Sequence, residues 1–113
     1  EENADGFVTL PDDVVGRGEH FVLEIRGESM ISAGIMNGDF VVIKRQQTAQ
    51  NGDIIIAMLD GEATCKRYFK EPDRFRLQPE NPRMRPIYTK KVDIVGRVVA
   101  VYRTYAEGKK KSR

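Results

Sequence analysis

Three short turn signals separate β-prone runs in the middle of the chain, and they restrict the possible folds more than any other feature. Asn37-Gly38, Asn51-Gly52 and Asp60-Gly61 supply the positive φ angles that tight hairpins need. The segments predicted as strands are residues 21–26, 40–44, 53–59, 62–70, 74–77 and 93–103. Many short strands joined by such turns predict an all-β fold, a sandwich or a partly closed barrel.

The remaining segments add little regular structure. Residues 78–88 contain three prolines and are predicted as a loop, and one helical turn is expected near residues 32–36. The longest apolar run, residues 54–59, has six residues and predicts a strand buried on both faces. A membrane-spanning helix needs about 20 residues, so no membrane span is expected.

Composition excludes several classes of protein. The 113 residues fit one domain, and the single Cys and single His argue against a disulfide scaffold or a structural zinc site. We expect no cofactor and a cytoplasmic location, since no targeting segment is present. The net charge of +2 divides into +3 for residues 107–113 and −1 for the rest. Residues 106–113 are predicted to be a disordered basic tail, and the body is not expected to bind DNA.

Ser29 is the first candidate for chemistry. It lies in Gly27-Glu28-Ser29-Met30, directly after a predicted strand, where backbone N–H groups near Glu28 and Ser29 can form an oxyanion hole. By itself this signal is weak, because serines beside glycines are usually turn residues. The single histidine, His20, is nine residues earlier on an extended segment. Because an extended chain rises about 3.3 Å per residue, His20 would lie far from Ser29 along the strand, which disfavours a Ser-His-Asp triad.

Lysine is the other known base for a serine nucleophile, and it must be neutral to act. Burial lowers a lysine pKa, so the candidate should lie on a strand among small or apolar neighbours. Lys66 fits this description, and the two-residue period of a strand places Thr64 beside it to orient the amine. The alternative is an ordinary exposed strand lysine.

Two neighbours of Lys66 on the same predicted strand have simpler interpretations. Cys65 points to the opposite face and is predicted to be a small core residue, because a nucleophilic cysteine would need a nearby histidine. Glu62 shares the Lys66 face and either contacts a bound chain or is a solvated carboxylate.

A family resemblance joins these residues. The chain resembles the C-terminal domain of the LexA repressor family, including a serine-to-lysine separation of 37 residues. The motifs that carry it are Gly27-Glu28-Ser29-Met30, Ile35-Met36-Asn37-Gly38-Asp39, Asn51-Gly52-Asp53-Ile54, residues 60–66, Leu77-Gln78-Pro79-Glu80-Asn81-Pro82 and residues 94–99.

The resemblance implies a β-rich fold shared with signal peptidases, with Ser29 as nucleophile and Lys66 as general base. It implies cleavage of an Ala-Gly bond in the protein's own linker when the RecA filament on single-stranded DNA stimulates it. It also implies a homodimer through the C-terminal strand, residues 93–105, and operator binding only by an N-terminal domain missing from this chain.

Domain boundaries follow from the same resemblance. Residues 1–9 would be linker left after the cleavage region, residues 10–105 the Ser-Lys peptidase and dimerisation domain, and residues 106–113 the tail. Three alternatives stay open: a UmuD-like subunit of a translesion polymerase, a phage repressor domain, and a non-enzymatic dimerisation module. The residues upstream of Glu1 would decide between a repressor and a UmuD-like subunit, since a DNA-binding domain indicates the former and a short arm the latter.

Overall fold

The computed structural model describes residue 13 and residues 16–105, so the linker and tail predicted for residues 1–9 and 106–113 lie outside it. In the described part, seven strands form one antiparallel sheet in the order β1-β2-β7-β3-β4-β5-β6. The elements are β1 (His20–Glu24), the 3-10 helix η1 (Ile31–Ala33), β2 (Phe40–Arg45), β3 (Ile54–Leu59), β4 (Glu62–Glu71), β5 (Arg74–Gln78), β6 (Ile87–Thr89) and β7 (Asp93–Tyr102). The all-β prediction is confirmed, but the sheet is open and not closed into a barrel.

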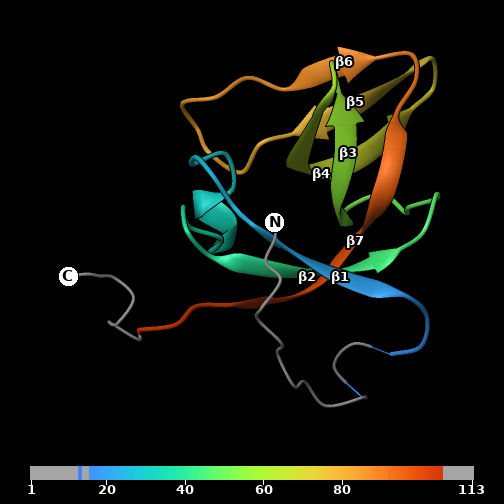
Figure 1. Cartoon of the computed structure of the whole chain (residues 1–113). Coiled ribbons are helices and arrows are strands. Elements are labelled where there is room, and N and C mark those ends of the chain that lie inside the picture. The colour runs from blue at the N-terminus through green and yellow to red at the C-terminus, as the bar shows by residue number, and fades with distance from the viewer. Residues whose placement is uncertain (1–12, 14–15, 106–113) are drawn as a thin grey trace.

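β7 connects the two halves of this sheet. Its first part pairs with β3 and its second part with β2, and each pairing contains a register shift. Figure 1 shows the result: β1, β2 and the end of β7 form a lower half, and β3 to β6 form an upper half. The coiling of the sheet brings the end of β1 and the start of β4 to the walls of one cleft, described below.

Two buried clusters fill the two halves. The first comprises Met30, Ile35, Val41, Ile43, Ile56 and Cys65. The second comprises Ile55, Ala57, Tyr68 and Leu77. β3 contributes to both clusters because alternate side chains of a strand point to opposite faces. The prediction of a strand buried on both faces is confirmed, since Ile55, Ile56 and Ala57 are at most 2% exposed.

The predictions for individual turns and loops are confirmed in part. The Asp60-Gly61 turn joins β3 to β4 with φ angles of 52° and 82°, as a tight hairpin requires. The expected helical turn occurs as η1, slightly earlier than predicted. Residues 78–88 are not all loop, because β6 begins at Ile87 and pairs with Leu77 of β5. The three nearby prolines concealed this short strand. Across the described residues, no helix has the length and apolar character needed to cross a membrane.

Candidate active site

Lys66 lies on a regular part of the sheet. It pairs with Ile55 of β3, and its side chain is among the buried polar groups at 7% exposed. The amine Nζ donates to Thr64 Oγ1 at 2.7 Å and to Ser29 Oγ at 3.3 Å. The structure therefore places Thr64 beside Lys66 on one strand face, as predicted, and brings Ser29 to the same amine.

Burial lowers the pKa of Lys66, because the charged ammonium loses its water shell while the amine meets two neutral hydroxyl groups. A charged Cys65 would oppose this shift, but it is a smaller cause than burial. Burial raises the pKa of Cys65 to about 11, so the thiol stays neutral near pH 7 and supplies no negative charge. The environment favours a neutral amine, the form that can accept a proton.

Ser29 occupies a different kind of setting, the segment of residues 25–39 between β1 and β2, here called the serine loop. The hydroxyl of Ser29 has a second, long contact of 3.4 Å to the carbonyl of Cys65. The next residue, Met30, is 1% exposed in the first core cluster, and its carbonyl accepts the N–H groups of Ala33 and Ile35. Met30 thus anchors the loop while Ser29 remains at its surface.

A segment distant in the sequence holds the serine loop from the other side. The N–H of Glu80 donates to the Ser29 carbonyl, and the Glu80 carbonyl accepts the N–H of Ser32, both at 2.7 Å. The side-chain amide of Asn81 donates to the Glu28 carbonyl at 2.8 Å. Sequence reasoning assigned no role to Glu80 or Asn81, although both belong to a motif that carried the family resemblance.

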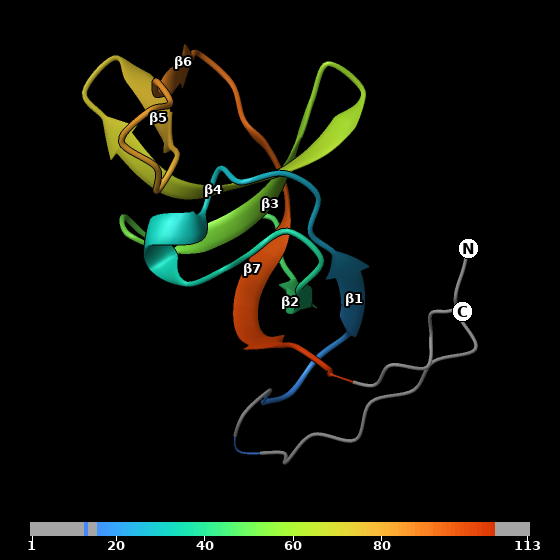
Figure 2. The same cartoon turned by 90° about the vertical axis from the view of Figure 1, so that its left-hand side faces the viewer.

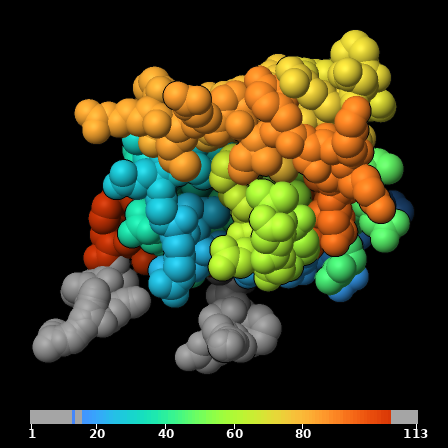
Figure 3. Space-filling view, turned by 90° about the horizontal axis from the view of Figure 1, so that it is seen from above, coloured from blue at the N-terminus to red at the C-terminus, as the bar shows by residue number. Residues whose placement is uncertain are grey.

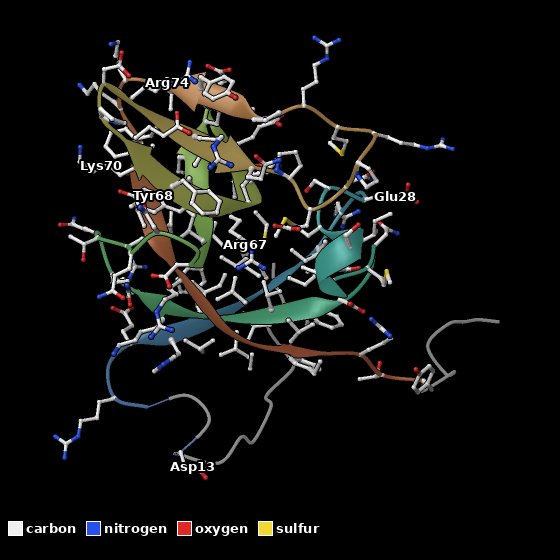
Figure 4. All side chains as sticks on the ribbon, turned by 180° about the vertical axis from the view of Figure 1, so that it is seen from behind. Asp13, Glu28, Arg67, Tyr68, Lys70 and Arg74 are labelled. Carbon is white, nitrogen blue, oxygen red and sulfur yellow. The ribbon has the colours of Figure 1, made fainter. Side chains whose placement is uncertain are left out.

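Arg67 ties this segment to β4. Its Nε donates to Glu80 Oε2 at 2.8 Å, and its Nη1 donates to the carbonyl of Gly52 at 2.5 Å. Figure 4 shows Arg67 near the middle of the molecule and Glu28 at its edge beside η1. The strand that carries Lys66 and the loop that carries Ser29 are therefore joined through Glu80.

Ser29 and Lys66 line a cleft of about 580 Å³. Its walls are residues 23–29 and residues 62–66, with Ile56 and Met84. Figure 2 shows η1 in front of β3 and β4, and in Figure 3 the blue-to-cyan serine loop lies against the green turn between β3 and β4. Among the described residues, β4 pairs only with β3 over residues 62–66, since β5 begins to pair at Arg67, so the cleft meets a strand edge that no described strand covers.

The other sequence candidates do not join the dyad. His20 lies at the far end of β1, where its Nδ1 is 2.9 Å from the carbonyl of Gly18. Cys65 is a core residue, as predicted, and Glu62 is exposed at the rim of the cleft. The side chain of Glu28 is exposed, and only its backbone is engaged by Asn81. Across the described part, no group of three or more metal-ligating side chains is assembled.

The chain contains one Ala-Gly pair, Ala33-Gly34, inside the serine loop. It closes η1, where the Gly34 N–H donates to the Ile31 carbonyl and Ala33 packs against the first core cluster. This pair is folded into the wall of the loop and is not presented to Ser29 as an extended segment.

The serine loop is also fixed from the C-terminal side of β7. Asp39 is 1% exposed and accepts two hydrogen bonds from Arg103, at 2.6 and 2.8 Å, while Arg103 also donates to the Gly34 carbonyl. The hydrogen bonds from Arg103 lower the pKa of the Asp39 carboxyl, which also accepts the N–H of Met36. The carboxylate therefore stays ionised although it is buried.

The chain is similar to known proteins over most of its length. The chain is 55% identical over 102 residues to the LexA repressor of Pelotomaculum thermopropionicum and 55% identical over 105 residues to that of Bacillus velezensis, covering about 90% of this chain in each case. It spans about half the length of these curated relatives (50% and 51%). The profile of the Peptidase S24-like family matches residues 1–99. This chain therefore belongs to the peptidase S24-like family.

Proposed function

We propose that this chain is the C-terminal autoproteolytic domain of a LexA-type repressor of the SOS response, a cytoplasmic serine peptidase with a Ser-Lys dyad. The observation that carries the proposal is the buried Lys66 amine, 3.3 Å from Ser29 Oγ. The curated relatives named above are LexA repressors, which favours this reading over a UmuD-like subunit or a phage repressor.

In the proposed reaction, neutral Lys66 accepts the proton of Ser29 while Oγ attacks the scissile carbonyl. The protonated Lys66 then gives that proton to the leaving amine, and water hydrolyses the acyl-enzyme. Thr64 holds the amine in line with Ser29 through its hydrogen bond of 2.7 Å. Backbone N–H groups near Glu28 and Ser29 stabilise the oxyanion.

The proposed substrate is an extended segment of the repressor's own linker that carries an Ala-Gly bond upstream of Glu1. An extended chain can add to the unpaired edge of β4 at residues 62–66, where its backbone finds hydrogen-bond partners. The RecA filament on single-stranded DNA would favour the docked state of the linker, which is a shift of population. Operator DNA would be bound by the N-terminal domain of the full-length repressor.

The test is cleavage in trans of a peptide that carries the upstream Ala-Gly site. We expect Ser29→Ala and Lys66→Ala to abolish cleavage, whereas Lys70→Ala, an exposed lysine on the same strand, keeps it. Undiminished cleavage by either dyad variant refutes the assignment. A second arm adds the RecA filament to full-length repressor, where cleavage in cis should accelerate.

A dimerisation role has its own observation. From Val98 to Tyr102, β7 pairs with β2 on one side, and in the described part of the chain no strand covers its other side. Such an edge can pair with the same edge of a second copy across a two-fold axis. We expect sedimentation to show a dimer that Val101→Glu weakens, since Val101 is 40% exposed. A dimer that never cleaves the peptide would favour the non-enzymatic reading.

A further inference from the structure

Among the described residues, hydrogen bonds hold the peptide bond between Glu28 and Ser29 at its carbonyl end only. Its carbonyl accepts the hydrogen bond from Asn81. Because a trans peptide is planar, its N–H points away from its carbonyl, so the Ser29 N–H points away from Asn81. Among the described residues, no protein acceptor is found for the N–H groups of Glu28 or Ser29. These donors are left available at a residue that lines the cleft.

The Asn81 amide can satisfy its neighbours in one orientation only. Its Nδ2 donates to the Glu28 carbonyl at 2.8 Å, and its Oδ1 accepts the N–H of Arg83 at 2.9 Å. Rotating the amide by half a turn would set oxygen against oxygen and N–H against N–H. The donor is therefore directed at Glu28 by the turn that follows Asn81.

The position of Asn81 is in turn fixed relative to Lys66. Glu80 precedes it and bonds to the Ser29 carbonyl through its backbone and to Arg67 through its carboxylate. Arg67 follows Lys66 on β4. The groups that orient the Ser29 backbone are therefore held in position relative to β4, the strand that carries the candidate base.

We propose that Asn81 is a positioning residue that sets the oxyanion site by holding the Glu28–Ser29 peptide in the orientation that turns the Ser29 N–H toward the substrate. This inference rests on the proposed function. Without the amide donor, the peptide is free to rotate and to present the Glu28 carbonyl where the oxyanion forms. A carbonyl there would repel the developing negative charge instead of stabilising it.

Two substitutions separate this role from simple loop support. Asn81→Asp keeps an acceptor for the Arg83 N–H but loses the donor to Glu28, whereas Asn81→Ala loses both contacts. We expect both to lower kcat for peptide cleavage by about tenfold to a hundredfold with KM unchanged. This is less than the roughly 10²–10³ that removal of an oxyanion donor costs, because the Ser29 N–H remains and only its orientation is lost. The control is Asn51→Ala, which removes a 2.7 Å side-chain bond to the Lys70 N–H in another loop.

A transition-state analogue gives the second readout. In a peptide aldehyde of the cleavage sequence, Ser29 Oγ adds to the aldehyde carbon, the hydroxyl proton passes to Lys66, and an oxyanion forms. Both Asn81 variants should lose affinity for the aldehyde in proportion to kcat and keep their affinity for the matching alcohol.

Three outcomes overturn the proposal: an unchanged kcat in Asn81→Asp, an equal loss in Asn51→Ala, or a parallel loss of aldehyde and alcohol affinity. Failure of the proposed function is distinguishable from these outcomes, because the unsubstituted protein would then neither cleave the peptide nor bind the aldehyde more tightly than the alcohol.

Discussion

The two halves of the candidate dyad are supported in opposite ways. Lys66 lies in the interior of a regular strand, where pairing with β3 fixes its backbone. Ser29 lies in the serine loop, and its backbone carbonyl accepts a hydrogen bond from the N–H of Glu80, a residue far away in the sequence. The local sequence pattern is therefore enough to predict the setting of the candidate base, whereas the position of the candidate nucleophile depends on tertiary contacts. The following predictions test this contrast.

The largest expected effect separates activity from stability at Lys66. Lys66→Met should lower peptide cleavage by at least about a thousandfold, since the proposed base is lost. The same change should raise the free energy of unfolding by about 1 kcal/mol, because a buried polar group gives way to an apolar chain of similar size. Cleavage rates and urea unfolding measure the two effects. A loss of stability would show that the buried amine supports the fold.

The next largest effect is expected from a substitution that disturbs the regular sheet, the part of the molecule that supports Lys66. A Cβ at Gly96 would overlap the Lys44 carbonyl and the Ile43 side chain, at the point where β7 passes from β3 to β2. We expect Gly96→Ala to destabilise the fold by about 3 kcal/mol, because backbone atoms must move apart. Thermal unfolding tests this against Val22→Ala, a 42% exposed position on β1, which should cost less than about 1 kcal/mol.

A pH profile tests the environment of the base. Since burial lowers the pKa of Lys66, kcat should rise about tenfold per pH unit below the shifted pKa and level off above it, with a midpoint below 10.5. Stability follows the same sign. Between the folded and unfolded pKa values the unfolded chain binds more protons, so stability rises with pH there and is lowest below the folded pKa. A midpoint at or above 10.5 contradicts the assignment of a buried base.

The smallest effect concerns the orienting hydroxyl. Thr64→Val keeps the shape of the side chain and removes the 2.7 Å hydrogen bond to the Lys66 amine. A bond of this kind is worth about 1 kcal/mol, so we expect kcat to fall about fivefold. Thr89→Val, whose hydroxyl bonds the Lys91 carbonyl outside the site, serves as the control. Equal effects of the two variants would remove Thr64 from the mechanism.

The extent of sequence-based prediction follows the same contrast. β-Branched runs and the Asp60-Gly61 turn predicted the strands around Lys66, and the period of two placed Thr64 beside it, because those signals are local. β6 was missed, since its three residues follow Pro86 and are stabilised by pairing with β5. Asn81 and Glu80 were not identified as site residues, because their partners at residues 28–32 are brought to them only by the folded sheet.

The ion pair between Asp39 and Arg103 makes the serine loop sensitive to shortening of the chain at its C-terminal end. Arg103 directly follows β7, yet its guanidinium neutralises the buried carboxylate of Asp39, the last residue of the serine loop. A protease that trims the chain to a point before residue 103 would leave Asp39 as an unpaired interior charge, a costly state for a folded protein. Trimming at this end should therefore loosen the loop that carries Ser29. Proteolytic loss of Arg103 from a stored sample would then disturb the candidate nucleophile, although the two residues are far apart in the sequence.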